Sequence, residues 1–342
     1  MTWGAGDPAR QRGVRAPATE PGEMPLLIEP QSATLARHPP SHGDWLYEIK
    51  FDGYRMLARL EDGAVRLVSR NGLDWTKRMP RLRDALAKLP VDNAWLDGEA
   101  VVLDENGRPD FNALQNAFDR RSSANVTLFL FDLLWLDGIE RRQEPLRTRR
   151  LLLRELLEVV DSPLIRFSEN FDGDPEHILA ATREMKLEGI IGKRADAPYH
   201  SGRSPNWIKL KCHQQQEFVV GGIARGSSGV DSLLLGVFEQ GGTLRYVGSV
   251  PPYFRSRQAA AFLAHATPHD ISPFRNTPKP ERNREYLWLK PEIVVEVSFH
   301  EWTPRGELRE ARFLALRHDK LAREVTVEHA IDPDRLSWAK GL

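Results

Sequence analysis

The stretch EIKFDGYR, at residues 48–55, is the most informative part of this chain. Apolar residues flank Lys50 on both sides, and the segment Leu46–Asp52 is predicted to be a half-buried strand. A lysine in such a strand is costly to keep charged, because burial disfavours the ammonium form. We therefore expect Lys50 to carry a neutral amine, which is a nucleophile. The alternative interpretation of this stretch alone is an edge strand whose lysine reaches to solvent.

The composition predicts a soluble, cytosolic protein. The chain has 342 residues, of which 41% are hydrophobic and 28% are charged, and this length allows two domains with separate cores. No apolar run approaches the ~20 residues that span a bilayer, and the N-terminus lacks the apolar core of a secretion signal. The single cysteine, Cys212, excludes an intramolecular disulfide and a Cys-rich zinc site.

The charge pattern alone does not decide between kinds of partner. Basic and acidic residues number 48 each, which argues against nonspecific coating of nucleic acid. Arginines nevertheless cluster between Arg141 and Arg154. This cluster fits a basic binding face and a solvated helix start equally well.

The order of predicted elements indicates an α+β fold. Residues 1–22 are rich in Gly, Pro, Ala and Arg, and we expect a flexible tail there. Residues 23–212 combine helices with strands that are joined mainly by hairpins. Residues 213–335 hold short strands and one helix, which is typical of a Greek-key barrel of the oligonucleotide-binding (OB) type. Residues 336–342 would form a C-terminal tail.

The individual elements follow from hydrophobic periodicity and turn signals. Helices are predicted at Lys77–Leu89, Phe111–Arg121, Leu146–Val160, Pro175–Leu187 and Arg255–His265. Further strands are predicted at Tyr54–Leu60, Ala64–Ser69, Trp95–Leu103, Val126–Trp135, Glu188–Arg194, Trp207–Lys211, Phe218–Ala224, Leu233–Glu239, Thr243–Val250, Ile293–Phe299 and Leu308–Leu316.

A pair of lysines indicates an anion site. The segment WIKLK, at residues 207–211, alternates, so Lys209 and Lys211 share one face of a strand. Like charges on one strand face are unfavourable unless an anion lies between them. A phosphate would supply that anion, and the pair would stabilise charge that develops on it.

Two acidic residues lie at apolar strands and are candidate metal ligands. Glu99 belongs to LDGEAV, at residues 96–101, and Glu188 begins EGIIGKR, at residues 188–194. Two carboxylates are too few to enclose a metal ion. This is typical of Mg²⁺, which keeps waters and shares ligands with substrate phosphates. For each acid the alternative is a structural ion pair or a turn hydrogen bond.

Three further segments hold candidate site residues. Arg70 lies in the turn SRNG, at residues 69–72, where its planar fork suits a phosphate, although a plain hairpin turn is the alternative. Phe131 lies in an apolar strand, where a core position is the alternative. The segment LRHDK, at residues 316–320, brings Arg317, Asp319 and Lys320 together in the predicted barrel domain.

These motifs, in this order, resemble those of the ATP-dependent DNA ligases, which belong to the covalent nucleotidyltransferases. The similarity is greatest to the ligase domain of bacterial ligase D from non-homologous end joining, and it extends from roughly Met24 to Ile331. The resemblance implies a nucleotidyltransferase (adenylation) domain of antiparallel sheets with flanking helices, followed by an OB-fold β-barrel. It also implies ATP as a substrate, with Mg²⁺ or Mn²⁺.

The resemblance assigns a role to each residue of the first half of the site. Lys50 would accept AMP. Glu48 would meet the amino group of adenine, which favours ATP over GTP, and Phe131 would stack on the adenine ring. Arg55 would hold the ribose or the phosphate of a nick, and Arg70 a nucleotide or DNA phosphate.

The same resemblance covers the rest of the site. Glu99 would lie near the ribose and the metal, with Glu188 as a second metal ligand. Lys209 and Lys211 would bind the α-phosphate. Arg317 and Lys320 would orient the departing pyrophosphate, and Asp319 is a weaker candidate for that role. A separate domain that carries these residues implies closure for the first step and reopening afterwards.

The predicted function is to seal breaks between a 3′-hydroxyl and a 5′-phosphate in nicked or broken double-stranded DNA, through lysyl-AMP and DNA-adenylate. Few residues precede Lys50, so we expect the two core domains to grip DNA without a large helical clamp domain. The resemblance implies Ku as a partner, and the chain is expected to act as a monomer. Pro251 and Pro252 stand where a Gly-Thr-Gly-like turn is expected, which puts a DNA contact of that loop in doubt.

Two alternative functions remain at this point. An RNA ligase or a capping enzyme shares the lysine motif, but capping enzymes use GTP, and Glu48 argues against that nucleotide. A catalytically dead nucleic-acid-binding module is the other alternative, and it predicts no adduct with any nucleotide.

Overall fold

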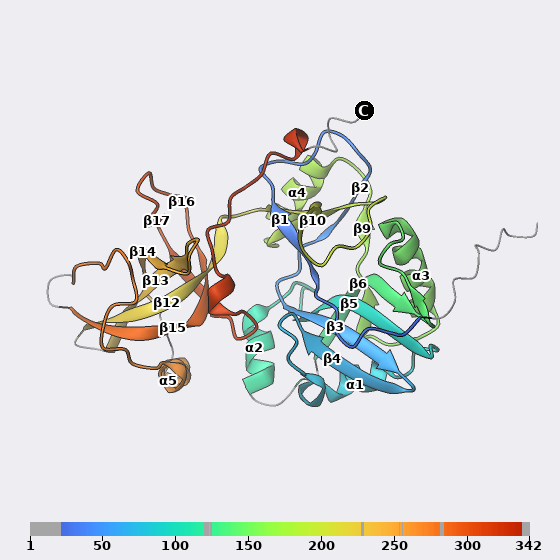
Figure 1. Ribbon diagram of the computed structural model, residues 1–342, viewed down its shortest axis with the longest axis horizontal. Coiled ribbons are helices and arrows are strands. Elements are labelled where there is room, and N and C mark those ends of the chain that lie inside the picture. The colour runs from blue at the N-terminus through green and yellow to red at the C-terminus, as the bar shows by residue number, and fades with distance from the viewer. Residues whose placement is uncertain are drawn as a thin grey trace, which may run out of the picture.

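The computed structural model describes residues 22–119, 123, 125–226, 229–252, 254, 256–280 and 284–336. The chain forms a larger lobe from its N-terminal part, blue to green in Figure 1, and a smaller lobe from its C-terminal part, yellow to red. The expected tails lie outside the described residues, apart from Gly22 and Leu336. Within the described ranges no helix combines the length and the apolar character that a membrane span requires.

The larger lobe contains a six-stranded sheet in the order β4-β3-β5-β6-β7, with β8 paired to β6. Its strands are β3 (Tyr54–Glu61), β4 (Ala64–Ser69), β5 (Asn93–Val102), β6 (Val126–Leu136), β7 (Ile139–Glu140) and β8 (Ile165–Phe167). The predicted hairpin is present, because β3 and β4 pair in antiparallel register from Met56–Ser69 to Glu61–Ala64. Alternating apolar residues of these strands, such as Met56, Leu96 and Leu128, are buried in one core.

A second sheet of five strands has the order β1-β11-β10-β2-β9. Its strands are β1 (Gln31–Leu35), β2 (Trp45–Ile49), β9 (Asn170–Phe171), β10 (Gly189–Arg194) and β11 (Gly202–Lys211). The edge strand β1, which the sequence patterns did not indicate, pairs in parallel with β11. This sheet carries Glu48 on β2 and Lys209 and Lys211 on β11, so it positions much of the predicted site.

Helices flank these sheets, as expected for an α+β fold. They are α1 (Pro80–Leu86), α2 (Phe111–Asp119), α3 (Leu146–Glu158) and α4 (Pro175–Glu184). The first predicted helix is shorter than expected, because a 3₁₀ turn at Thr76–Arg78 precedes it and Pro80 begins the α-helix. The side chain of Asp174 caps α4 by accepting hydrogen bonds from the backbone N–H groups of Glu176 and His177.

The smaller lobe is built on a five-stranded antiparallel sheet in the order β14-β13-β12-β15-β18. Its elements are β12 (Gln215–Gly226), β13 (Gly229–Phe238), β14 (Leu244–Val250), α5 (Ser256–His265), β15 (Glu285–Ser298) and β18 (Arg312–Leu316), with the small hairpin β16 (Glu301–Trp302) and β17 (Leu308–Arg309). The register of β12 shifts at Gly221, where an added Cβ would lie 2.5 Å from the ring of Phe274. Glycine therefore allows the strand to bend closely over the core.

Several strand boundaries also differ from those expected. The strand β2 ends at Ile49, so Lys50 follows the strand and its N–H donates to the carbonyl of Gly189, at 2.9 Å. The strand predicted at Leu308–Leu316 is interrupted by Glu310, whose φ of 52° breaks the extended backbone. The strand predicted at Ile293–Phe299 begins earlier, at Glu285, because β15 pairs with β12 from Gln215 to Arg225 with one register shift.

The chain returns from the smaller lobe to the larger one through residues 325–335, here called the C-terminal strap (Figure 1). It follows a 3₁₀ turn at Ala322–Glu324 and ends in another 3₁₀ turn at Pro333–Arg335. Ile331 forms a parallel bridge with Ala36, and its N–H donates to the carbonyl of Leu35 at 2.9 Å. The strap therefore joins the edge of the second sheet beside β1.

Candidate active site

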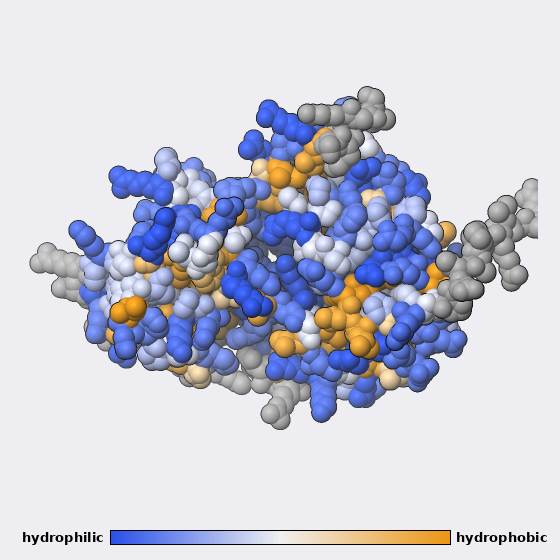
Figure 2. Space-filling view, viewed as in Figure 1, coloured by the Kyte–Doolittle hydropathy of each residue, from blue (hydrophilic) through white to orange (hydrophobic). Residues whose placement is uncertain are grey.

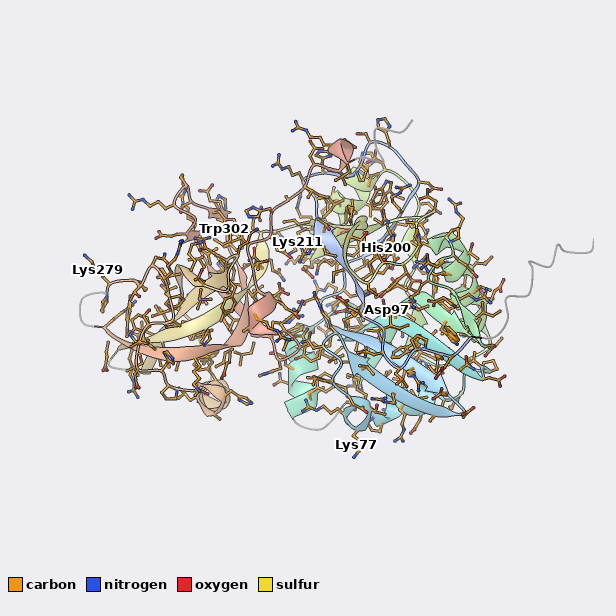
Figure 3. The ribbon with its side chains drawn as sticks, viewed as in Figure 1. Lys77, Asp97, His200, Lys211, Lys279 and Trp302 are labelled. Carbon is orange, nitrogen blue, oxygen red and sulfur yellow. The ribbon has the colours of Figure 1, made fainter. Side chains whose placement is uncertain are left out.

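A cleft between the two lobes, hollowed into a hydrophilic surface in Figure 2, is lined by every residue that the sequence predicted for the site. These residues are Glu48, Lys50, Arg55, Arg70, Glu99, Phe131, Glu188, Lys209, Lys211, Arg317 and Lys320. We call this space the interlobe cleft. Figure 3 labels Lys211 on the side of the larger lobe that faces the smaller one.

Lys50 lies at the end of β2 and forms an ion pair and hydrogen bond with Glu188, which directly precedes β10. Burial acts to lower the pKa of Lys50, but the carboxylates of Glu188 and Asp52 outweigh it and raise the pKa above its usual value. The expectation of a neutral amine is therefore wrong for this arrangement, in which Lys50 is a cation. The sequence argument considered burial without the acidic partners that the fold brings to the lysine.

Glu48 is buried in the lining of the cleft and is held by several polar side chains. Its carboxylate lies 2.8 Å from the Nζ of Lys193 and 2.8 Å from an Nη of Arg150, and it accepts a hydrogen bond from the hydroxyl of Ser168 at 2.7 Å. Lys193 was not predicted as a site residue, although it lies in the EGIIGKR segment. Burial lowers the pKa of Lys193 to about 8, although Glu48 opposes this change.

Phe131, on β6, forms an aromatic wall with Trp207 of β11, whose ring centroid lies 5.9 Å away. The Nζ of Lys193 lies over both rings, 4.0 Å from the centroid of Phe131 and 4.3 Å from that of Trp207. The sequence did not identify Trp207 as part of the site. Its position two residues before Lys209 on the same strand face was the available signal.

Arg55, on β3, is engaged by an acidic residue that the sequence did not identify. Its Nε and Nη2 donate to the two carboxylate oxygens of Asp97 at 2.5 and 2.6 Å. Asp97 also accepts a hydrogen bond from the hydroxyl of Tyr199 at 2.6 Å. The bidentate pair fixes the guanidinium 4.6 Å from the ring centroid of Phe131. A contact of Arg55 with ribose or phosphate stays a prediction.

Glu99 and Glu188 both line the cleft and offer oxygen ligands, which hard divalent cations prefer. Burial raises the pKa of Glu99 to about 7, against the opposing influence of Arg55 and Lys50. A bound cation would return such a carboxyl to its charged form. Within the described ranges, the one set of three ligand atoms within 4.8 Å of one another, at His38, Asp332 and Asp334, involves neither acid. The cleft acids thus suit a cation that shares its ligands with phosphate.

Lys209 and Lys211 share one face of β11, as predicted, and an anion does lie between them. That anion is the carboxylate of Glu328, from the C-terminal strap, which pairs with Lys209 and lies 3.0 Å from the Nζ of Lys211. Burial and the charge of Lys211 lower the pKa of Lys209 to about 8. Burial alone would raise the pKa of Glu328, but both lysines outweigh it and lower that pKa to about 2. No local pattern in the sequence indicated Glu328.

The motif LRHDK reaches the cleft from the smaller lobe. Arg317 is buried and donates to Glu296 at 2.7 Å, to Asp319 at 2.9 Å and to the carbonyl of Gly53 at 3.4 Å. Lys320 pairs with Glu217 at 2.9 Å. Arg317 therefore touches the EIKFDGYR stretch itself, and the two lobes are closed upon each other at this point.

Arg70 lines the cleft beside a second contact between the lobes. The side-chain amide of its neighbour Asn71 donates to the backbone carbonyl of Asp319 at 2.8 Å. The turn SRNG thus reaches the LRHDK motif, which a plain hairpin turn would not require.

The arginine cluster between Arg141 and Arg154, which begins before α3 and continues into it, combines buried and solvent-exposed ion pairs. Its members are paired with acids of the larger lobe: Arg141 with Glu144, Arg147 with Asp44, Arg149 with Asp132, Arg150 with Glu48 and Arg154 with Glu169. The Arg149–Asp132 pair is fully buried, with 2.7 Å between Nε and Oδ1. The buried pairs of this cluster therefore join elements of the larger lobe, and Arg150 also holds Glu48 in the lining of the cleft. Pro251 and Pro252 follow the end of β14, and the DNA contact of that loop stays untested.

Comparisons with known proteins show which family the chain resembles. Residues 31–211 match the family described as ATP dependent DNA ligase domain, and residues 226–320 match the ATP dependent DNA ligase C terminal region. The chain is 42% identical, over 98% of its length, to the multifunctional non-homologous end joining protein LigD of Pseudomonas aeruginosa, and it spans 41% of that protein. It is 31% identical to DNA ligase C1 of Mycolicibacterium smegmatis, covering 82% of this chain and 84% of the relative.

A solved structure described as mycobacterial DNA ligase D complexed with ATP and MES has the same fold. It superposes with a TM-score of 0.63 at 38% identity and covers 88% of this chain and 98% of that one. The predicted α+β architecture, with an adenylation domain followed by an OB-fold domain, is thereby confirmed. The chain belongs to the family of ATP-dependent DNA ligases.

Proposed function

We propose that this chain seals breaks between a 3′-hydroxyl and a 5′-phosphate in double-stranded DNA, with Lys50 as the residue that carries AMP. The observation that supports this most strongly is the convergence of Lys50, the Lys209–Lys211 pair and Arg317 on one cleft, from both lobes. Membership of the ATP-dependent DNA ligase family does not favour the alternatives, which are an RNA ligase, a capping enzyme and a catalytically dead binding module.

In the proposed first step the Nζ of Lys50 attacks the α-phosphorus of ATP. The N–P bond forms, the bond between the α-phosphorus and the bridging oxygen breaks, and pyrophosphate leaves with that oxygen. Lys50 must first lose a proton, because its pKa is raised in this arrangement. Glu188, in direct contact with the Nζ, is the group that would accept it.

The charges of the cleft fit the other groups of ATP. Lys209 and Lys211 would hold the α-phosphate and stabilise the charge that develops there. Arg317 and Lys320 would lie beside the leaving pyrophosphate when the lobes are closed. Glu99 and Glu188 would hold Mg²⁺ or Mn²⁺, which when bound offsets the charge of the transferring phosphate.

The adenine end of the cleft would be recognised by Glu48 and Phe131. Phe131 offers a ring face beside Trp207, and Glu48 is an acceptor for an exocyclic amino group. Glu48 already accepts hydrogen bonds from Arg150 and Ser168 and forms an ion pair with Lys193. These donors fix the direction of its carboxylate, which would favour adenine over guanine through geometry rather than charge alone.

The second and third steps move AMP onto DNA and off again. The 5′-phosphate of the break attacks the phosphorus of lysyl-AMP, so that the N–P bond breaks and a pyrophosphate link forms. The 3′-hydroxyl then attacks the 5′-phosphate, loses its proton, and displaces AMP. Arg55 and Arg70 are the residues that we assign to phosphates in these steps, and the smaller lobe must move for DNA to enter.

The biological setting is proposed from the relatives. The chain spans 41% of the Pseudomonas aeruginosa protein and 37% of its mycobacterial counterparts, which are multifunctional non-homologous end joining proteins. We infer a role in double-strand break joining in the bacterial cytoplasm, with Ku as partner and the chain as a monomer.

The proposal is tested by intact-mass measurement after incubation with ATP and Mg²⁺. We expect the mass to increase by one adenylyl group in the wild type and in Lys77→Ala, whose lysine is exposed far from the cleft (Figure 3). Lys50→Ala should gain nothing, and GTP should give no adduct. A wild type that stays unmodified with several divalent metals would refute the proposal. Sealing of nicked DNA, a nicked DNA–RNA hybrid and blunt ends would then define the substrate.

A further inference from the structure

We propose that Glu328 is a built-in substitute for the α-phosphate of ATP, which holds the anion position between Lys209 and Lys211 and must leave it when the nucleotide enters. The inference rests on the proposed function in that it takes these two lysines as the α-phosphate site. It adds that the chain's own carboxylate occupies this site in the closed arrangement of the lobes.

The contacts of Glu328 are those that an anionic ligand of the site would make. One carboxylate oxygen pairs with Lys209 and the other lies 3.0 Å from Lys211, so the two oxygens bridge the two cations. The side chain of Glu328 is 11% exposed, and those of Lys209 and Lys211 are 14% and 9% exposed. Two buried cations side by side require a counter-charge, which either Glu328 or a phosphate can supply.

Glu328 is held in this position by the backbone of the C-terminal strap. Its N–H donates to the side-chain carbonyl of Gln216 at 3.1 Å, and the amide of Gln216 donates to the carbonyl of Thr326 at 2.9 Å. Farther along, Ile331 pairs with the edge of the second sheet, and Asp334 accepts from the N–H of Ser41 at 2.8 Å. Hydrogen bonds therefore hold the backbone on both sides of Glu328. Its carboxylate is already in position to compete with a phosphate for the two lysines.

Competition for one anion site has a defined effect on binding. The nucleotide can use the lysines only in the fraction of molecules from which Glu328 has withdrawn, and its apparent affinity is reduced by that fraction. Removal of the carboxylate charge should therefore strengthen ATP binding, whereas loss of a residue that helps to bind ATP would weaken it. The direction of the change distinguishes a substitute for phosphate from a supporting residue.

The first experiment measures self-adenylation of Glu328→Gln over a range of ATP concentrations. The glutamine keeps the shape and the acceptor oxygen but removes the charge that both lysines require. We expect the KM for ATP to fall about tenfold, which corresponds to about 1.4 kcal/mol, with kcat unchanged or higher. Glu307→Gln, which removes one exposed carboxylate of the smaller lobe, is the matched control and should keep the wild-type KM.

An unchanged or raised KM in Glu328→Gln would overturn the inference. A wild type that forms no adduct with ATP would instead refute the proposed function, so the two failures are distinguishable. The comparison is valid if Glu328→Gln unfolds at the wild-type temperature, as thermal unfolding followed by circular dichroism will show.

The second experiment needs no variant and therefore does not depend on that stability. Hydrogen exchange of the wild type is measured with and without α,β-methylene-ATP, whose bridging carbon blocks the transfer of AMP. If the α-phosphate displaces Glu328, peptides that cover residues 326–331 should exchange faster with the analogue bound, because the N–H of Glu328 loses its acceptor on Gln216. Unchanged or slower exchange of this segment in the saturated protein would contradict displacement.

Discussion

The Nζ of Lys50 and the Oε2 of Glu188 lie in direct contact, although they reach the cleft from neighbouring strands that are far apart in the sequence. The contact makes the proposed nucleophile a cation before nucleotide binds. It also places the acceptor for its proton next to it. The chemistry of the first step therefore depends on a pair of residues rather than on a lysine that burial alone has neutralised.

The first prediction concerns Glu188→Gln. The raised pKa of Lys50 means that the neutral amine becomes common only as the pH rises towards that pKa. Removal of the Glu188 charge lowers this pKa, so the pH at which the adenylation rate levels off should fall. The rate itself should decrease at least about 100-fold, because the proton acceptor is lost. Single-turnover adenylation from pH 6 to 10 measures both effects, with exposed Glu184→Gln as control. A wild-type rate with an unmoved profile would be incompatible with this role.

The second prediction concerns stability and Glu99. Its pKa is raised by burial from 4.5 to about 7, so the folded protein binds more protons than the unfolded chain between these values. Glu99 therefore reduces the free energy of unfolding as the pH rises through this range. Without divalent cations, Glu99→Gln should be more stable than the wild type at pH 8 by roughly 1–3 kcal/mol, and equal to it below pH 4.5.

Urea unfolding of both proteins at pH 4 and pH 8 checks this expectation, with exposed Glu105→Gln as control. The same variant should lose adenylation, because the proposed metal ligand is gone. If Glu99→Gln is more stable but keeps its adenylation activity, Glu99 affects stability but is not a metal ligand.

The third prediction concerns Lys209→Ala. Loss of one cation from the α-phosphate site should slow adenylation about 100- to 1,000-fold. The fold should be kept, because Lys211 still pairs with Glu328 at 3.0 Å. Single-turnover adenylation measures the rate and circular dichroism measures the fold, with exposed Lys290→Ala as control. Full activity in a folded Lys209→Ala protein would show that the pair does not bind the phosphate.

The fourth prediction concerns closure of the lobes. Asn71→Ala removes the hydrogen bond to the carbonyl of Asp319, which links the lobes. One such bond contributes about 1 kcal/mol, so the closed form should become about fivefold less populated. Self-adenylation should slow by this factor, whereas sealing of pre-adenylated nicked DNA should keep its rate. Asn116→Ala, exposed on α2, serves as control. Equal slowing of both reactions would argue that Asn71 acts on DNA instead.

Local patterns predicted the parts of this protein that depend on neighbours in the sequence. The hairpin of β3 and β4 and the common face of Lys209 and Lys211 follow from alternation within a few residues. Every site residue that the motifs predicted lines the interlobe cleft. Partners that are distant in the sequence could not be predicted in this way. Glu328 lies 119 residues from Lys209, and no periodicity links them.

The charge state of Lys50 shows the same limit. Burial and charged neighbours act on its pKa in opposite directions. Burial and the nearby Asp52 were visible in the sequence, but Glu188, which is 138 residues away from Lys50, was not. The pairing of Arg55 with Asp97 is similar, because Asp97 belongs to a recognised motif but its partner depends on how β3 and β5 align.

The bridge between Ile331 and Ala36 has a consequence for handling this protein. β1 is the outermost strand of its sheet, and the strap covers the end of its free side. A protein shortened to end soon after Lys320 would leave that side without its hydrogen-bonding neighbour. Bare outer strands recruit other molecules through their backbone groups. Such a shortened enzyme would therefore tend to aggregate, even though all of the residues proposed for catalysis are still present.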